Sequence, residues 1–285
     1  MKTVGDVSPL LVTVVGLALG LGLGLVGTWL ARVLPRRYEI DFEPSATTAH
    51  RRNVTIVVLS ALLSAGVGYY VAIHPASPLG GAAVSLATHA ILSSMLVTAA
   101  AIDLEHMILP HEITWGGTAL ALASAYFRGL GLVSSLIGAV AGLALTYLPF
   151  LLYKKLRGRS GMGLGDAHLA VLAGAWLGAE GVIFVIFAGA IQSALAALVM
   201  RVAGVPYGIP ESVQAQLAAL RRLADEGDAD AKAALADDPM AADVGAGEHG
   251  VLSMRLPMGP FLVLGCIEFL FGRKWILGVF ETFFG

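Results

Sequence analysis

The chain has 285 residues, of which 57% are hydrophobic and 13% are charged, whereas a soluble domain carries roughly 25% charged residues. This imbalance, together with a mean hydropathy of +0.79, excludes an ordinary soluble protein. The net charge of −2 leaves no basic excess for a nucleic-acid partner. The single cysteine, Cys266, excludes an intrachain disulfide and a cysteine-based zinc site.

Apolar blocks long enough to cross the ~30 Å hydrocarbon layer of a bilayer follow one another along the chain. The first five cover residues 9–31, 54–73, 82–102, 110–127 and 130–153. The block 167–200 is too long for one crossing, so we expect it to fold back at residues 178–181. Its first half should then begin below the membrane surface. With a last block at 257–271, the sequence predicts an all-α, polytopic membrane bundle of about eight helices.

The distribution of Lys and Arg predicts the orientation of these blocks. The first apolar run is too long for a signal peptide, and Arg32 follows it, so we expect an uncleaved anchor with its N-terminus outside. Eight alternating crossings then place most of the 18 Lys and Arg on the cytoplasmic side. The exceptions are Lys2, Arg128, Arg273 and Lys274, and the last two leave open whether the final block crosses fully.

One long polar segment, residues 204–255, interrupts the apolar blocks. Its periodicity predicts a short cytoplasmic helix at residues 211–223, with an apolar face of Val213, Leu217, Leu220 and Leu223. The acidic tract that follows from Asp225 favours a flexible, solvated loop. We therefore divide the chain into a membrane bundle of seven spans (1–203), a partly flexible insertion (204–255), and a last span with an interfacial C-terminal segment (256–285).

Carboxylates beside membrane spans are costly to place there and are functional candidates for that reason. Asp103 ends the third block, and Asp166 ends the motif Gly163-Leu164-Gly165-Asp166 just before an apolar helix. Two carboxyl groups brought together share a proton, so one takes a proton from water while the other polarises a peptide carbonyl. Glycines before Asp166 allow the backbone to approach a substrate strand. The structural alternative is that Asp166 caps its helix and Asp103 is solvated.

Four segments in this order resemble the type IV prepilin peptidases, which are bacterial inner-membrane aspartic peptidases of the GxGD class. They are the residues around Asp103, the motif at 163–166, the segment 174–178 and the segment 256–261. The resemblance implies that Asp103 and Asp166 are the catalytic pair, with Gly163 and Gly165 as motif support. It also implies multi-pass insertion in the inner membrane with the site facing the cytoplasm. The implied substrates are type IV prepilins and type II secretion pseudopilins, which lose a short basic leader.

The chain departs from this family in ways that bear on cofactors. Many members also N-methylate the new amino terminus with S-adenosylmethionine, and many carry two CxxC zinc pairs in a larger loop after the first span. Here that loop, residues 32–52, has no cysteine, which excludes the zinc and leaves methylation open. No cofactor is expected for hydrolysis. S-adenosylmethionine is expected as a cofactor only if methylation is retained. His111 and His168 stand where the family often has Asp and Lys.

Polar residues near the aspartates are expected to form a wet rim rather than a metal site. We define this polar rim as Glu105, His106, His111, Glu112 and His168. His111 and Glu112 begin an HExxH pattern, but Trp115 occupies the second ligand position.

The non-enzyme alternative is a transporter or proton pathway that uses Asp103, Asp166 and Glu268 as relay carboxylates. It predicts polar residues along several spans, whereas the acids here cluster at one face. A GxSG pattern at 158–161 matches serine rhomboid peptidases but has no histidine poised for its serine. Substrate identity and oligomeric state stay open.

A glycine stripe in the first block should pack against a neighbouring helix. It consists of Gly16, Gly20, Gly24 and Gly27, which recur at helical spacing inside an apolar span. Small residues at this spacing allow two helix backbones to approach closely in a membrane.

Overall fold

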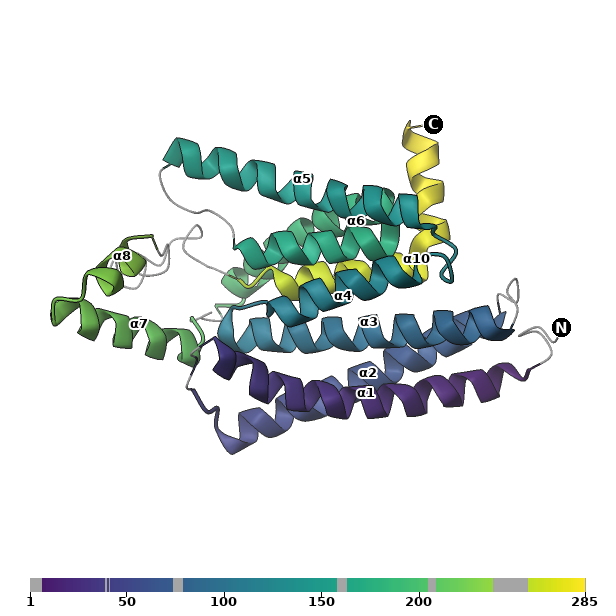
Figure 1. Ribbon diagram of the computed structural model, residues 1–285, viewed down its shortest axis with the longest axis horizontal. Helices are drawn as coiled ribbons and strands as arrows, with labels where there is room; N and C mark the ends of the chain where they lie inside the picture. Colours follow the sequence, from purple (N-terminus) through teal and green to yellow (C-terminus); the bar gives the residue numbers. More distant parts are fainter. Residues whose placement is uncertain are drawn as a thin grey trace.

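A computed structural model of the chain describes residues 7–38, 40, 42–73, 79–157, 163–204, 209–237 and 256–284. Within these ranges the regular structure is helical, and no strand is present. The helices are α1 (Pro9–Arg37), α2 (Ala46–Ile73), α3 (Leu79–His106), α4 (His111–Ser124), α5 (Leu132–Arg157), α6 (Leu164–Val202), α7 (Glu211–Asp225), α8 (Ala229–Asp237) and α10 (Gly259–Phe284). Figure 1 shows one bundle of long helices, with α7 and α8 beyond one end. The all-α class is confirmed.

Five of the described helices are long and apolar enough to cross a membrane, namely α1, α2, α3, α5 and α6. Their outward faces are strongly apolar; on α5, for example, Val133 is 70% exposed and Val140 is 66% exposed. Such continuous apolar surface requires lipid rather than water around it. Helix α4 has 14 residues and is shorter than a full crossing. Helix α10 continues through Arg273, past the expected end at 271. The number of eight crossings therefore stays a prediction.

Helix α6 is broken where the sequence predicted a fold-back. Gly178 has φ 85° and ψ 179°, a backbone conformation that is essentially restricted to glycine. Figure 1 shows α6 turning back there. At 1.5 Å per residue, the part from Leu164 to Leu177 measures about 21 Å. This half-helix begins at the end of the bundle where α7 lies, which we call the α7 end.

Hydrogen bonds to side chains satisfy the carbonyl groups that the break leaves free. The Arg128 guanidinium, in the turn between α4 and α5, donates to the carbonyls of Ala121, Ala175 and Trp176. The hydroxyl of Ser135 also donates to the Ala175 carbonyl. Free carbonyls at a helix end need such partners when they are buried. Arg128 therefore ties the C-terminal ends of α4 and of the half-helix together.

Close packing of glycines brings neighbouring helices together, as the stripe in the first block predicted. Gly16, Gly20 and Gly24 are buried against α2, where a Cβ at Gly24 would lie 2.7 Å from the Cα of Val57. Gly27 is buried against Thr98 of α3. The prediction of a packing stripe is confirmed.

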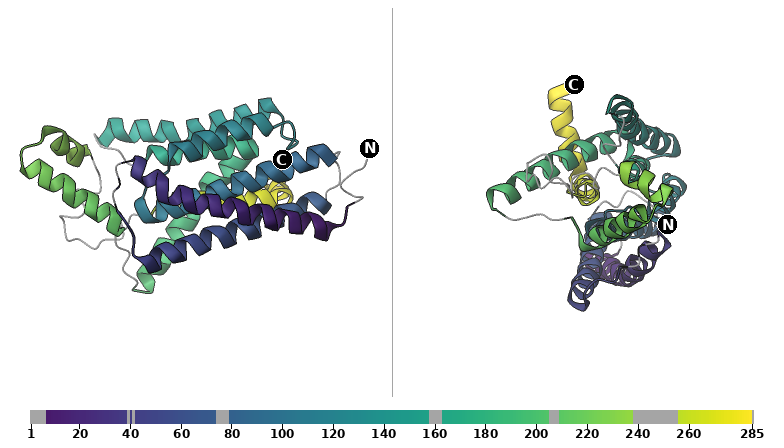
Figure 2. Two further views of the ribbon diagram at one scale, coloured as in Figure 1. Left: turned by 60° about the horizontal axis from the view of Figure 1, so that its bottom comes forward. Right: turned by 90° about the vertical axis from the view of Figure 1, so that its left-hand side faces the viewer.

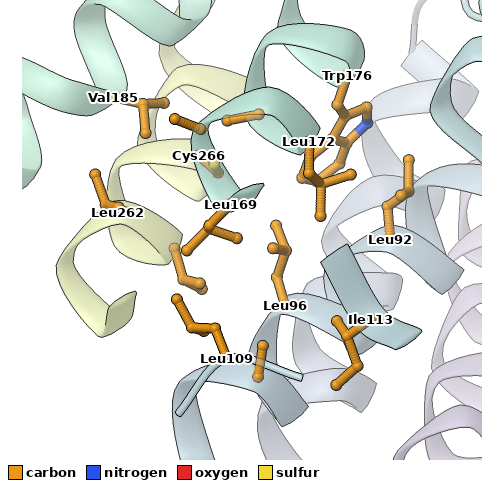
Figure 3. Packing of buried hydrophobic residues seen from close by; sticks show 14 of the residues in the cluster. Leu92, Leu96, Leu109, Ile113, Leu169, Leu172, Trp176, Val185, Leu262 and Cys266 are labelled. Atoms are coloured by element: carbon orange, nitrogen blue, oxygen red, sulfur yellow. The ribbon is translucent and has the colours of Figure 1, made fainter. Parts of the chain in front are cut away.

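The apolar core lies around the first half of α6 (Figure 3). Leu169, Leu172 and Trp176 from this half-helix are buried among side chains of α3, α4 and α10. Figure 3 shows Leu96 of α3 and Ile113 of α4 facing them. Because a packed core has few voids, this contact fixes the half-helix in place. The start of α6 is thereby held against the end of α3.

The insertion begins with the predicted helix, which is confirmed as α7. Val213 and Leu217 are 6% and 3% exposed, whereas Leu223, at the other end of the apolar face, is 45% exposed. Only the first part of α7 reaches the bundle, and its remainder projects from it (Figure 1 and Figure 2). Helix α8 was not predicted. Its N-cap is Asp228, whose Oδ1 accepts hydrogen bonds from the N–H groups of Asp230 and Ala231 at 2.8 and 3.0 Å.

Candidate active site

Asp103 lies one turn before the end of α3, at the α7 end of the bundle. The residue is 5% exposed. Its Oδ2 accepts a hydrogen bond of 3.1 Å from the backbone N–H of Gly259, the first residue of α10. A Cβ at position 259 would collide with the same oxygen. A glycine is therefore required for the backbone to reach this carboxylate.

Asp166 lies in the first turn of α6 and is half-buried. The N-cap of this helix is Gly163, and no side chain forms a cap hydrogen bond there. The backbone N–H of Asp166 donates to the Gly163 carbonyl at 3.2 Å. The Asp166 side chain is therefore not the helix cap that the structural alternative required. Its position at the positive end of the helix dipole favours a negative charge.

The two aspartates come from different helices, Asp103 from α3 and Asp166 from α6. Leu109, in the connection between α3 and α4, packs against two segments: the one that precedes Asp166 and the one whose backbone binds Asp103. Its Cβ lies 3.0 Å from where a Cβ of Gly165 would be, and its Cδ2 lies 3.3 Å from the corresponding position at Gly259. The motif before Asp166 and the segment that binds Asp103 therefore converge on one side chain. Two carboxyl groups placed together in this way can divide acid and base roles.

The first part of the polar rim is buried. Glu105 accepts a hydrogen bond of 2.7 Å from Arg52 of α2, and the two side chains are 13% and 9% exposed. His106 Nε2 lies 3.9 Å from the same carboxylate oxygen, and His106 is 3% exposed. The structure places these two side chains in the interior, where Glu105 joins α3 to α2. They differ in this respect from the expected wet surface.

The second part of the rim is accessible and lies beside the start of α6. His111 and Glu112 are exposed, and the rings of His111 and His168 meet edge to face with centroids 4.9 Å apart. Trp115 also contacts the His168 ring, at 5.1 Å between centroids. His168 follows Asp166 by two residues, so this aromatic cluster borders the site. No three His, Cys, Asp or Glu side chains of the described ranges gather closely enough to hold a metal.

Tyr38 and Arg52 are site neighbours that sequence reasoning missed. The Tyr38 hydroxyl donates to Glu112 at 3.0 Å and accepts from the His111 backbone N–H at 2.7 Å. Burial raises the pKa of Tyr38, so that the hydroxyl stays protonated and can donate. No local pattern in the sequence pairs Tyr38 with α4 or Arg52 with α3. Both contacts depend on the tertiary fold.

Other polar residues lie away from the two aspartates. His89 precedes Asp103 by about 21 Å along α3, and its Nδ1 donates to the Ser85 carbonyl at 2.8 Å. It lines a cavity of about 130 Å³ with Arg128, Trp176 and Arg273. Glu268 accepts a hydrogen bond of 2.7 Å from Gln192 of α6, which makes it a helix–helix contact.

Comparisons with known proteins place the aspartates in a matched region. Residues 90–198 match the type IV leader peptidase family. Proteins named prepilin leader peptidase/N-methyltransferase are similar over parts of their length. The one from Neisseria gonorrhoeae is 37% identical over 117 residues, which is 40% of this chain and 40% of that protein. The one from Dichelobacter nodosus is 34% identical over 145 residues, which is 50% of this chain and 48% of that protein.

These matches are partial, because the chain spans less than half the length of these relatives. No solved structure matches the chain. The matched region nevertheless contains Asp103, the motif at 163–166, and the half-helix that follows it. The resemblance to the type IV leader peptidases is therefore confirmed over residues 90–198, the part of the chain that carries both aspartates.

Proposed function

We propose that this protein is a membrane aspartic endopeptidase that removes the short basic leader from type IV prepilins and type II secretion pseudopilins. One observation carries the proposal: the segments that hold Asp103 and Asp166 converge on Leu109 at one end of an apolar helix bundle. Both residues lie in the region that matches the type IV leader peptidase family. The relatives' names supply the substrate class, since they are called prepilin leader peptidases.

The chemistry follows from a pair of carboxyl groups that holds one proton. The ionised member takes a proton from a water molecule, which attacks the scissile carbonyl carbon. The protonated member donates a hydrogen bond to the carbonyl oxygen and stabilises the tetrahedral intermediate. A proton then passes to the leaving amine as the C–N bond breaks. The hydrogen bond from Gly259 fixes the rotation of the Asp103 carboxyl group during these steps.

We infer that the α7 end faces the cytoplasm of a bacterial inner membrane. The support is the distribution of Lys and Arg: the basic residues at the end of α1 and the start of α2 lie at the same end as the aspartates. A prepilin would lie with its own apolar helix in the bilayer, against the exposed apolar faces of the bundle. Its scissile bond would then reach the level of the aspartates.

Hydrolysis in this scheme uses no cofactor, and methyl transfer is a separate question. A cavity of about 310 Å³ lies at the α7 end. Its lining includes Phe42, Glu43 and three arginines, Arg32, Arg36 and Arg52. Arg36 pairs with Glu43 at 2.6 Å and Arg52 with Glu105 at 2.7 Å, so two of these three guanidinium groups are already neutralised. We propose the peptidase activity, with N-methylation of the new amino terminus as a further step only if S-adenosylmethionine binds.

The transporter alternative requires a third carboxylate within relay distance. Glu268 is nine residues after Gly259 on α10, which places it about 14 Å along the helix from the Asp103 contact. Its carboxylate is also held by Gln192. The observed contacts therefore favour chemistry at the α7 end over passage through the bundle.

The direct test is to incubate the purified protein in liposomes with a prepilin and to follow the mass of the pilin. We expect the mass to fall by that of the leader, and a gain of one methyl group when S-adenosylmethionine is added would show that methylation is retained. A pilin that keeps its leader under conditions in which the protein is folded and inserted would contradict the proposal.

A further inference from the structure

The first helix of the insertion contacts the end of the helix that carries Asp103. The hydroxyl of Ser212 donates a hydrogen bond to the backbone carbonyl of Glu105. Ser212 is 1% exposed, and the neighbouring Val213 and Leu217 are 6% and 3% exposed. Helix α7 therefore packs on the bundle through a buried face. The residue that it contacts, Glu105, lies two residues after Asp103.

The segment that α7 contacts is a strained turn. Helix α3 ends at His106, and Met107 has a φ of 52°. This left-handed conformation is unfavourable for a residue with a side chain and is usually taken by glycine at a helix end. The backbone N–H of Met107 donates to the carbonyl of Asp103 at 2.9 Å. The backbone of Asp103 is thus part of the turn.

Two contacts oppose the strain in this turn. The Glu105 side chain is held by Arg52 from α2. The Glu105 carbonyl is among the last carbonyls of α3, which have no partner within the helix, and Ser212 supplies a donor for it. One contact therefore comes from the bundle, and the other comes from the insertion.

We propose that α7 is a positioning element of the active site and that Ser212 is its positioning residue. The Ser212 hydroxyl, by holding the Glu105 carbonyl, keeps the turn at Met107 closed and the Asp103 carboxyl group directed toward its partner. This inference rests on the proposed peptidase function. It assigns a role to the start of an insertion that the family resemblance left without one. Helix α8 packs on α7 beyond the end of the bundle (Figure 2) and is not part of the contact.

The first test is Ser212→Ala, measured as kcat and KM for a prepilin. The substitution removes one hydrogen bond from a buried carbonyl, so we expect kcat to fall roughly fivefold to tenfold. KM should change little because the substrate surface is intact. Ser193→Ala is the matched control, since the Ser193 hydroxyl also bonds a backbone carbonyl, that of Ala190, but on an exposed part of α6. An unchanged kcat for Ser212→Ala would overturn the inference.

The second test separates positioning from a general loss of stability. Met107→Gly removes the strain that the contact opposes, so adding it to Ser212→Ala should restore most of the lost kcat. A double variant no better than Ser212→Ala, or rescue of the unfolding temperature without rescue of kcat, would contradict a positioning role. The single variant Met107→Gly provides the reference rate.

A third measurement does not depend on activity. The amide of Met107 should exchange its hydrogen faster in Ser212→Ala than in the wild type, because the turn opens more often. Equal exchange rates would refute the contact's role even if prepilin is not the substrate. Conversely, faster exchange with no cleavage by the wild type would contradict only the proposed function.

Discussion

The backbone N–H of Gly259 donates to Oδ2 of Asp103 at 3.1 Å, across 156 residues of sequence. The contact joins the start of α10 to the end of α3, and Leu109 lies beside Gly259. The carboxyl group of Asp103 is therefore oriented by a segment that lies after the insertion. The matched region 90–198 does not include this segment.

The first prediction concerns this contact. Gly259→Ala would place a Cβ against the Asp103 carboxylate, so we expect cleavage to fall at least roughly tenfold, the effect of about 1.4 kcal/mol in the transition state. Gly278→Ala is the matched control in the same helix, because no atom lies within 4 Å of its Cβ position. Cleavage rates of inserted protein are compared, and equal rates for both variants would mean that Gly259 does not orient Asp103.

The second prediction concerns the rest of the insertion. Deleting residues 226–247 removes α8 and leaves α7, whose Ser212 makes the contact with α3. We expect membrane insertion and leader cleavage to be retained within about twofold, because exposed segments that make few contacts tolerate deletion. The rate is measured on the same prepilin. If the deletion abolishes cleavage while the protein stays folded, α8 or the residues after it belong to the site.

The third prediction concerns metal. Because water activation is assigned to two carboxylates, strong chelators should leave the cleavage rate unchanged. The rate is measured before and after dialysis against a chelator, with zinc added back as a control. A loss of activity that zinc restores would contradict this prediction. It would indicate that His111 and His168, whose ring centroids are 4.9 Å apart, are zinc ligands.

The fourth prediction concerns the broken helix. Arg128→Gln removes donors from the carbonyls of Ala121, Ala175 and Trp176. The Ala175 carbonyl keeps its donor from Ser135, whereas the carbonyls of Ala121 and Trp176 lose their Arg128 donors. At about 1–3 kcal/mol for each buried carbonyl, we expect a loss of roughly 3 kcal/mol in the free energy of unfolding. Thermal unfolding in detergent measures it. Arg201→Gln, an exposed arginine near the end of α6, serves as the control; an equal effect there would contradict the capping role.

The sequence predicted the features that depend on composition and local pattern. The long apolar blocks predicted the membrane helices, and the length of the block 167–200 predicted a break near Gly178 in α6. The periodicity after residue 211 predicted α7. Glycine spacing in α1 also predicted its contact with α2. These features are predictable because each depends on neighbours in sequence or on the bilayer.

The features that were missed depend on contacts between distant segments. The burial of Glu105 follows from its pairing with Arg52, 53 residues away, and no periodicity marks such a pair. The exposure of Leu223 follows from where α7 leaves the bundle, since only its first turns are covered. For the site, pattern and resemblance selected Asp103 and Asp166, but the donor from Gly259 and the contact from Ser212 required the fold.

The fifth prediction tests the aspartate pair, which is the centre of this account. Asp103→Asn and Asp166→Asn keep the size of each side chain and remove its acid–base function. Each should lower prepilin cleavage by roughly a thousandfold or more, and the double variant should be little worse than either single one, since members of a catalytic unit are not additive. Glu268→Gln, which removes a carboxylate held by Gln192, should retain most activity.

The most direct measurement is the rate of leader removal by the two Asn variants, with insertion in liposomes verified for each. If the two aspartates share the catalytic proton, neither variant cleaves at a measurable rate while the wild type converts the prepilin fully. Substantial cleavage by either variant would contradict a mechanism in which Asp103 and Asp166 share the catalytic proton.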